Sequence, residues 1–269
     1  MPDAAGPPLA AWGLTGPGAA LPAGAEAVFK CGHLVLKHAD NVEEAEWCAA
    51  ALAQVGEDGF RLARPVRALD GRWVVDGWTA CHWVEGANDV DGRWAELLAA
   101  GRAFHRAMAH VPRPDLFARR RTRWAVADRV AWDEADIPII AALDGPFRAL
   151  RARLRPPAGT EQVVHGDLSG NVLFAPGLAP AIIDFSPYWR PAPYADAVAL
   201  VDGLLYREAP DAILDEHLPG ADGAQYAARA CLFRAATLSQ YLAALPRDAD
   251  AHAEVSVTLR VMARLRRRL

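Results

Sequence analysis

Residues 163–174 read VVHGDLSGNVLF, and they place His165, Asp167 and Asn171 between two runs of strand-forming residues. Aspartate and asparagine are common in turns because their side chains bond to the nearby backbone. The same side chains can also carry chemistry when several of them are held at the end of a strand. The residues that follow decide between these two interpretations.

Residues 172–184 predict a β-hairpin. VLF leads away from Asn171, the segment APGLAP predicts a turn, and AII leads back to Asp184. In an antiparallel pair, Asn171 and Asp184 would lie side by side at the same end. Their amide and carboxylate oxygens are hard ligands suited to Mg²⁺, which takes its other ligands from water and substrate phosphates. Asp167, four residues before Asn171, could orient an incoming hydroxyl or accept its proton, so the combination favours a catalytic loop.

The bulk composition is that of an ordinary globular protein. The chain has 269 residues, 52% of them hydrophobic and 23% charged, which is enough for one large domain or two small ones. A formal net charge of -4 gives no basic field that would favour nucleic acid or an anionic membrane. Residues 1–14 lack the segments of a signal peptide, and no apolar stretch is long enough to span a bilayer, so we expect a cytoplasmic protein.

The cysteines are scattered and have no CxxC spacing. They are Cys31, Cys48, Cys81 and Cys231. A zinc site made by Cys31 and His33 with Cys81 and His82 would be conceivable, but these pairs fall inside strand-like runs and lack the usual ligand spacing. We therefore expect reduced thiols.

The first 85 residues predict a small antiparallel sheet with one helix. AVFK and HLVLK are strand-like runs around a Cys31–Gly32 turn, and Asp76–Gly77 is a strong hairpin signal between two β-rich runs. Residues 41–55 predict a helix that Asn41 caps. The apolar stripe of this helix would comprise Val42, Ala45, Ala49 and Leu52. Residues 86–269 predict a larger, mostly helical part that the hairpin interrupts, which makes the fold class α+β.

The motif HGDLSGN followed by IIDF resembles the signature of the aminoglycoside phosphotransferase and choline kinase family. The fuller stretch VVHGDLSGNVLF…AIIDFSPYWRP resembles an actinobacterial subgroup of that family. The likeness covers most of the chain. It implies a two-lobed protein-kinase-like fold, with a nucleotide-binding N-lobe of small antiparallel sheet and one helix over residues 1–85. Residues 86–269 would form the C-lobe, with the catalytic loop, metal site and substrate pocket. The implied cofactors are ATP and Mg²⁺, and the implied reaction moves the γ-phosphoryl group to a small-molecule hydroxyl.

The resemblance also assigns roles to individual residues. It makes Asp167 the catalytic base or hydroxyl-orienting carboxylate, and it makes Asn171 and Asp184 the Mg²⁺ ligands. Lys37, one of only two lysines among 29 basic residues, would contact the α- and β-phosphates and pair with an acid on the following helix. Glu44 is the expected acid. Glu46, about 200° away around the helix, is the alternative.

Further assignments concern the nucleotide and the shape of the catalytic loop. Adenine would bond to the backbone C=O of His82 and N–H of Val84. Gly24 is the single glycine of the phosphate-covering segment LPAGAEAV, where a protein kinase has three, so phosphate affinity could be lower. His165 would hold the catalytic loop in shape through hydrogen bonds. Asp196 would brace that loop from a helix start, or simply cap the helix.

The acceptor is constrained by charge. From Pro187 to the C-terminus the chain has as many arginines as acids, which does not favour a polycation such as an aminoglycoside. Trp189 and Arg190 follow Asp184 closely and could line the acceptor pocket, where a sugar or an anionic small molecule would suit them. Surface packing of Trp189 is the alternative.

The leading hypothesis is an ATP- and Mg²⁺-dependent small-molecule kinase. One alternative is a non-catalytic nucleotide-binding regulator with a kinase-like fold, but a degenerate site usually lacks one of the assigned residues, and here all are present. A metal-dependent phosphoester hydrolase is more remote, because a two-metal site would need more His and Asp than residues 163–190 supply.

Overall fold

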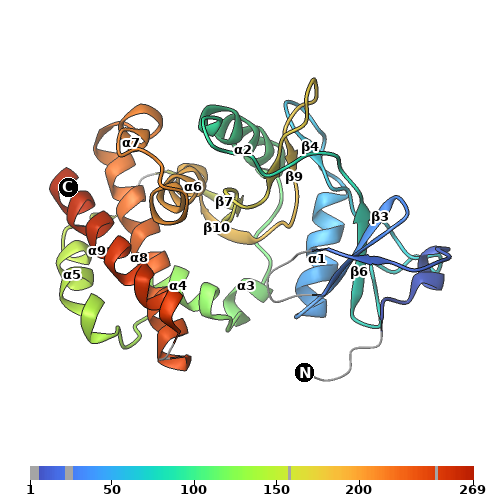
Figure 1. Cartoon of the computed structure of the whole chain (residues 1–269), viewed down its shortest axis with the longest axis horizontal. Coiled ribbons are helices and arrows are strands. Elements are labelled where there is room, and N and C mark those ends of the chain that lie inside the picture. Colours follow the sequence, from blue (N-terminus) through green and yellow to red (C-terminus); the bar gives the residue numbers. More distant parts are fainter. Residues whose placement is uncertain (1–5, 22–26, 157–158, 246–247) are drawn as a thin grey trace. The chain divides into compact units, whose positions relative to one another are not determined.

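The structure is a computed structural model that describes residues 6–21, 27–156, 159–245 and 248–269. It divides into two compact units (Figure 1). The first contains Met1–Asn88 and Asn171–Phe185, and the second contains Asp89–Gly170 and Ser186–Leu269. The expected boundary after residue 85 lies close to the observed one. The hairpin, which was expected within the larger part, groups instead with the first unit.

The described residues of the first unit form two small sheets and one α-helix. Its elements are a 3₁₀ helix η1 (Leu9–Trp12), β1 (Ala19–Ala20), β2 (Val28–Cys31), β3 (Leu34–His38), α1 (Val42–Leu52), β4 (Arg61–Leu62), β5 (Val74–Val75), β6 (Trp78–His82), β8 (Val172–Leu173) and β9 (Ala181–Ile182). The larger sheet is antiparallel with strand order β1-β2-β3-β6-β5, and the smaller has the order β4-β9-β8. Leu34 and Leu36 of β3 are buried in the core under the larger sheet.

Two tight turns form the larger sheet. Val75 pairs with Trp78, and the residues between them, Asp76 and Gly77, have φ of 51° and 82°. Both values are positive, as the predicted two-residue hairpin turn requires. The β2–β3 turn lies one residue later than predicted, because Cys31 itself pairs with Leu34 and belongs to the strand.

Helix α1 begins where the sequence predicts. The side chain of Asn41 accepts a hydrogen bond from the N–H of Glu44 at 3.0 Å, which satisfies one of the unpaired donors of the first turn. The helix ends at Leu52, earlier than expected. Its buried residues lie in the C-terminal half, whereas Val42 is 47% exposed, so the predicted stripe is wrong at its first position.

Backbone pairing attaches the Asn171–Phe185 hairpin to the first unit. Strand β9 pairs in parallel with β4, so that Arg61 lies opposite Ala181. On the β8 side, Ala87 and Phe174 donate N–H groups to each other's carbonyls at 3.0 and 2.8 Å. Both anchors join residues about 90 to 120 positions apart in the chain, a separation that no local sequence pattern reveals.

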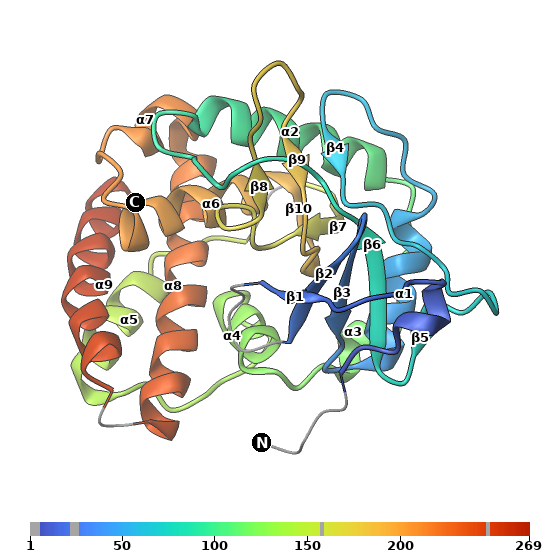
Figure 2. The same cartoon turned by 45° about the vertical axis from the view of Figure 1, so that its right-hand side comes forward.

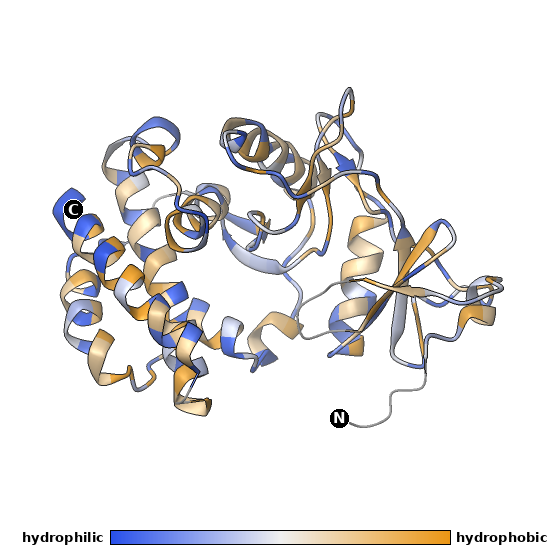
Figure 3. Ribbon diagram, in the orientation of Figure 1, coloured by the Kyte–Doolittle hydropathy of each residue, from blue (hydrophilic) through white to orange (hydrophobic). Residues whose placement is uncertain are grey.

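The second unit is mostly helical. Its elements are α2 (Trp94–Met108), α3 (Leu116–Arg119), α4 (Arg123–Ala131), α5 (Ala141–Arg151), β7 (Glu161–His165), β10 (Pro187–Pro191), α6 (Ala192–Tyr206), α7 (Ile213–His217), α8 (Gly220–Ala244) and α9 (Ala249–Arg268). Helix α8 packs against α4, α5, α6, α7 and α9 (Figure 2). Helix α8 is rich in alanine, and these small side chains let the neighbouring helices approach closely. The last turn of α9 is hydrophilic (Figure 3).

Strands β7 and β10 join the two segments of the second unit, Asp89–Gly170 and Ser186–Leu269. They pair antiparallel, with His165 opposite Pro187. Just beyond them, the N–H of Gly166 donates to the C=O of Ser186 at 2.9 Å. The chain therefore leaves the second unit after β7 and returns to it at β10, and these two strands are neighbours. In the part of the chain that the structure describes, no helix has the length and apolar character needed to cross a membrane.

Gly86 provides a test of how tightly the hairpin is attached. Its φ is 147°, and an added Cβ would lie 2.9 Å from Leu173 Cβ and 3.0 Å from the Phe174 carbonyl oxygen. We expect Gly86→Ala to separate the Ala87–Phe174 pair and to lower the free energy of unfolding by about 1–3 kcal/mol, measured by urea denaturation. Gly56→Ala is the matched control, because an added Cβ there meets nothing within 4 Å. Equal stability of the two variants would contradict this packing.

Candidate functional site

The end of the hairpin carries the first group of polar residues. The N–H of Ile183 donates to the C=O of Asn171 at 3.0 Å, continuing the β8–β9 ladder by one pair. Asn171 and Asp184 therefore lie at the same end of the hairpin, as the sequence predicts. Asp184 has a φ of 46°, a left-handed conformation that is uncommon for a residue other than glycine. With this backbone, the side chain no longer follows the alternation of faces along the strand. Residues in such conformations are often found at functional sites.

Lys37 meets Asp184 at this position. Its Nζ donates to Asp184 Oδ1 at 2.5 Å, and the two side chains are 30% and 49% exposed. Lys37 lies in the middle of the larger sheet, opposite Thr79 of β6 and Val28 of β2. Strands on both sides therefore hold the backbone from which its side chain extends. The next residue, Phe185, stacks on Trp47 of α1 with ring centroids 6.5 Å apart.

The charges of Lys37 and Asp184 affect the pKa of the Cys81 thiol. Burial raises the pKa of its thiol to about 11, and the fields of Asp184 and Lys37 act on it in opposite directions. The thiol is therefore protonated at neutral pH and is a poor metal ligand. None of the four cysteines forms a disulfide, and among the described residues no group of three or more His, Cys, Asp and Glu side chains gathers as a metal site. The zinc alternative has no support in these residues.

The donor set at the hairpin end fits Mg²⁺ better than a transition metal. It offers one amide oxygen from Asn171 and one carboxylate from Asp184, and both are hard oxygen ligands. Mg²⁺ keeps several waters and is typically bound by one or two protein groups together with substrate phosphates. The ammonium group of Lys37 adds a positive charge beside the carboxylate that phosphates could use.

The two candidate acids of α1 differ in their surroundings. Glu44 is half-buried, whereas Glu46 is exposed. The charge of Glu46 is a minor cause of the raised pKa of Arg72, after the hydrogen-bonded Asp70, which places Glu46 on the Arg72 side of the helix. This favours Glu44 as the partner of Lys37, and that pairing stays a prediction.

The expected adenine contacts lie along one edge of β6. On this edge, Val66 N–H donates to the C=O of Ala80 at 2.8 Å, and His82 N–H donates to the C=O of Arg64 at 2.9 Å. The C=O of His82 lies on the same edge as its N–H, whereas Val84 lies two residues beyond the end of β6. Within the described part of the chain, no hydrogen bond to either group is found. Gly24 lies outside the described residues.

The second unit holds Asp167 through its backbone. The N–H of Asp167 donates to His165 Nδ1 at 3.2 Å, and His165 is fully buried, so His165 supports the loop as the sequence predicts. Gly166 has to be a glycine, because a Cβ there would lie 2.3 Å from Tyr188 Cδ2. The His165 N–H in turn donates to His105 Nε2 at 3.1 Å. His105 packs in α2, as expected of a buried helix histidine, and its support of the β7 end was not predicted.

The side chain of Asp167 is held by a residue that the sequence analysis missed. Arg234 of α8 donates to Asp167 Oδ1 at 2.8 Å and also bonds both oxygens of Asp202, at 2.6 and 2.5 Å. Asp202 accepts a further hydrogen bond from Ser169 Oγ at 3.1 Å. Burial raises the pKa of Asp202, an effect that Arg234 partly offsets. Burial opposes the charge of Arg234, but Asp202 and Asp167 hold its pKa well above the usual value.

Asp196 is the fifth residue of α6, and its Oδ2 accepts a hydrogen bond from Arg102 Nε at 2.6 Å. Burial raises its pKa to about 6, and the bond to Arg102 lowers it in part. Its role in bracing the loop stays a prediction. Asp202, which lies later on the same helix, accepts a hydrogen bond from Ser169 of the loop. The helix-capping alternative is wrong, because the N-cap position is Pro191.

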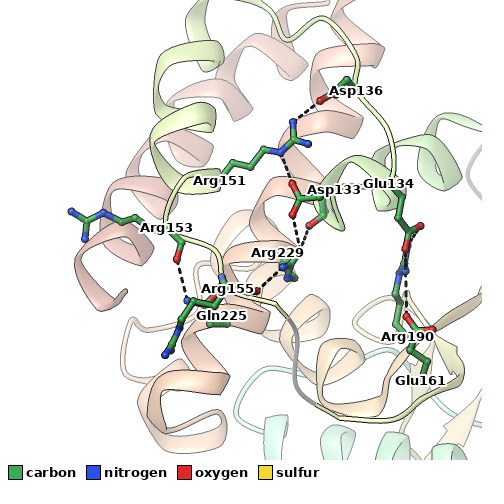
Figure 4. A network of polar contacts seen from close by, with 11 residues as sticks. Asp133, Glu134, Asp136, Arg151, Arg153, Arg155, Glu161, Arg190, Gln225 and Arg229 are labelled. Carbon is green, nitrogen blue, oxygen red and sulfur yellow. Dashed lines mark hydrogen bonds and ion pairs between the residues drawn. The ribbon is translucent and has the colours of Figure 1, made fainter.

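Arg190 lies in a buried network of ion pairs. Its guanidinium is buried and pairs with Asp128 at 2.6 Å. It also pairs with Glu134 at 2.6 Å, while Glu161 lies 3.7 Å away (Figure 4). It also lies over the Trp132 ring, 4.6 Å from the centroid. The charge of Arg190 is therefore already compensated. The neighbouring Trp189 is half-buried on β10, opposite Val163, which leaves its acceptor role a prediction.

Comparisons with known proteins identify the family and the fold of this chain. The sequence model described as the phosphotransferase enzyme family matches residues 19–232. No curated protein matches the chain. The fold is similar to that of the spectinomycin phosphotransferase APH(9)-Ia, solved with ADP and spectinomycin, with 14% identity, a TM-score of 0.58, and coverage of 94% of this chain and 93% of that one.

Two other solved structures are similar at comparable levels. A choline/ethanolamine kinase family protein from Mesorhizobium loti has 17% identity and a TM-score of 0.58, with coverage of 94% of this chain and 89% of that one. A thermostable mutant of the aminoglycoside phosphotransferase APH(4)-Ia has 16% identity and a TM-score of 0.56, with coverage of 92% and 94%. These similarities confirm the expected α+β, protein-kinase-like fold.

The buried histidine His105 predicts a dependence of stability on pH. Burial, with a smaller effect of His165, lowers the pKa of His105 to about 3 from an ordinary value of 6.5. Below pH 6.5 the unfolded chain therefore binds a proton that the folded protein does not, and stability falls as the pH decreases. We expect His105→Gln to remove about 1.4 kcal/mol per pH unit of that slope. Urea denaturation between pH 7 and 4.5 measures the slope. His110→Gln, at an exposed position, is the control and should leave it unchanged.

The buried ion pair of Arg190 predicts a large effect on stability. In Arg190→Met the carboxylate of Asp128, which is 5% exposed, loses its main compensating charge. We expect the free energy of unfolding to fall by about 3–5 kcal/mol. Arg148→Met removes a comparable contact to Asp144 from a side chain that is 73% exposed, and it should cost about 0–1 kcal/mol. If denaturation gave similar losses for both variants, the Arg190 network would not be structural.

Proposed function

The chain belongs to the phosphotransferase enzyme family, and from this premise we propose that it moves the γ-phosphoryl group of ATP to a hydroxyl group of a small molecule, with Mg²⁺ as the metal cofactor. The family match spans residues 19–232, a range that covers most of both units and contains every residue assigned to the reaction. It confirms the expected family resemblance and the expected enzyme class, a phosphotransferase.

The observation that carries the proposal is the contact between Lys37 and Asp184 at the end of the hairpin. A lysine fixed in the middle of a sheet bonds a carboxylate with left-handed backbone, and Asn171 lies at the same end of the hairpin. These are the groups that phosphoryl transfer requires around a metal–nucleotide complex, namely two oxygen ligands and one ammonium. A structural ion pair alone would not need Asp184 in an uncommon conformation.

The nucleotide is proposed to bind to the first unit. Lys37 would contact the α- and β-phosphates, with Glu44 as its partner on α1. The backbone C=O of His82 and N–H of Val84 would bond the adenine ring along the β6 edge. The solved structure of APH(9)-Ia contains ADP, and one of APH(4)-Ia contains AMP-PNP, which supports an adenine nucleotide here.

Asp167 is proposed to act on the acceptor. The acceptor hydroxyl would donate a hydrogen bond to its carboxylate, which orients the oxygen and accepts the proton as the new O–P bond forms. The bond between the γ-phosphorus and the bridging oxygen breaks, and ADP leaves. When bound, Mg²⁺ neutralises charge on the β- and γ-phosphates.

The acceptor is proposed to be a neutral or anionic hydroxyl compound. Several of the similar structures contain spectinomycin or hygromycin B. The segment after Pro187 has as many arginines as acids in this chain, so it offers no excess negative charge for a polycation. A sugar or a related polyol agrees with this balance.

Replacement of Asp167 tests the proposed chemistry. We expect Asp167→Asn to lower turnover by roughly 10²–10⁴-fold while ADP and Mg²⁺ still bind, because the amide cannot accept the hydroxyl proton. The measurement is Mg²⁺-dependent ADP release against libraries of sugars, polyols and antibiotics, with nucleotide binding followed by thermal shift. Asp58→Asn, at an exposed position, is the control.

Three outcomes would contradict the proposal. Wild-type turnover in Asp167→Asn would remove Asp167 from the reaction. Nucleotide binding without any transfer would support a non-catalytic regulator instead. Phosphoester cleavage without a nucleoside triphosphate would support a hydrolase.

A further inference from the structure

A buried guanidinium holds the Asp167 carboxylate from the neighbouring helix α8. The Nε and one terminal nitrogen of Arg234 bond the two oxygens of Asp202, and the same terminal nitrogen bonds Asp167 Oδ1. The exposed fractions rise along this chain of contacts, from 2% for Asp202 through 10% for Arg234 to 43% for Asp167. Asp202 is thus the buried anchor, and Asp167 is the end that reaches solvent.

The loop is fixed at further points around this contact. Ser169 donates its hydroxyl to Asp202, and Arg207 donates to the Ser169 C=O at 3.0 Å. The Asp167 N–H is bonded to His165. Asp167 is therefore held by its backbone N–H on one side and by one carboxylate oxygen on the other, which restricts the orientations that the side chain can adopt.

The loop is also short, which increases its need for outside support. Asn171 follows Asp167 by four residues, one fewer than in the H-R-D-x-x-x-x-N loop of protein kinases. Fewer residues between the two positions leave fewer local groups to hold the carboxylate. A rigid, two-pronged donor on a packed helix supplies this support from outside the loop.

We propose that Arg234 is the positioning residue of the phosphotransfer reaction, holding Asp167 in the orientation in which it receives the acceptor hydroxyl. This inference rests on the proposed function. Arg234 acts through Asp167 and touches neither nucleotide nor acceptor. Its guanidinium geometry matters as well as its charge, because a lysine ammonium cannot bond Asp202 through two nitrogens and hold Asp167 at the same time.

Helix α8 itself contains a matched control. Arg229 is 3% exposed and donates to the carbonyls of Ala131 and Arg155 at 2.7 and 2.8 Å, with Asp133 at 3.5 Å (Figure 4). It resembles Arg234 in burial and in ion pairing, but its contacts lie away from loop 166–170. Arg229→Lys and Arg234→Lys therefore make the same chemical change on one helix, and only the second disturbs Asp167.

The test compares these two variants with the wild type in ADP release from Mg·ATP, with water as the acceptor and with the best acceptor from the library screen. We expect Arg234→Lys to lower kcat roughly 10- to 100-fold with the KM for ATP unchanged, as misplacement of a catalytic group does. Arg229→Lys should keep both constants. In Arg234→Ala, added guanidinium chloride should restore part of kcat, whereas the same concentration of sodium chloride should not.

The outcomes separate the inference from the proposed function. If the wild type transfers phosphoryl to no acceptor, water included, the proposed function fails and this inference fails with it. If the wild type is active and Arg234→Lys keeps its kcat, only the positioning role is overturned. A rise in the KM for ATP with kcat unchanged, or equal losses in both lysine variants with lower thermal midpoints, would also overturn it and show a structural role.

Discussion

The pairing of a distant hairpin with the first unit is the interaction on which the candidate site depends. Strand β9 pairs with β4, and Ala87 exchanges two hydrogen bonds with Phe174. These backbone bonds set the register of the hairpin, since a shift by one residue would turn its side chains to the other face. The β8–β9 ladder itself places Asn171 and Asp184 at the same end of the hairpin. The attachment of the hairpin to the rest of the first unit brings Asp184 to Lys37.

Different physical means hold the acidic groups of the two units. In the first unit, Asp184 owes its direction to an uncommon backbone conformation and to a partly exposed lysine. In the second, Asp167 stands at the exposed end of a buried chain of charges that begins with Asp202 and passes through Arg234. Buried charges are costly when unpaired, so this chain tolerates few rearrangements. An exposed ion pair is weaker, and it can exchange its partner for an incoming phosphate.

Sequence reasoning succeeded where the determinants are local. The Asp76–Gly77 turn, the Asn41 cap and the β8–β9 hairpin each depend on a few consecutive residues, and all are present as predicted. Partners that lie far apart along the chain were missed or misplaced, because no periodicity marks them. Arg234 is 67 residues from Asp167, and the acids that neutralise Arg190 come from other segments. A signal was nevertheless available in AARACLFRAATL, where two arginines interrupt a small and apolar helix and therefore require buried partners.

The Cys81 thiol next to the Lys37–Asp184 pair is expected to react slowly. Cys81 has a pKa of about 11, so the reactive thiolate is scarce at physiological pH. Oxidants and electrophiles, which attack the thiolate, should spare it. The sulfur atom near Lys37 and Asp184 is therefore expected to stay a protonated thiol that takes part in packing.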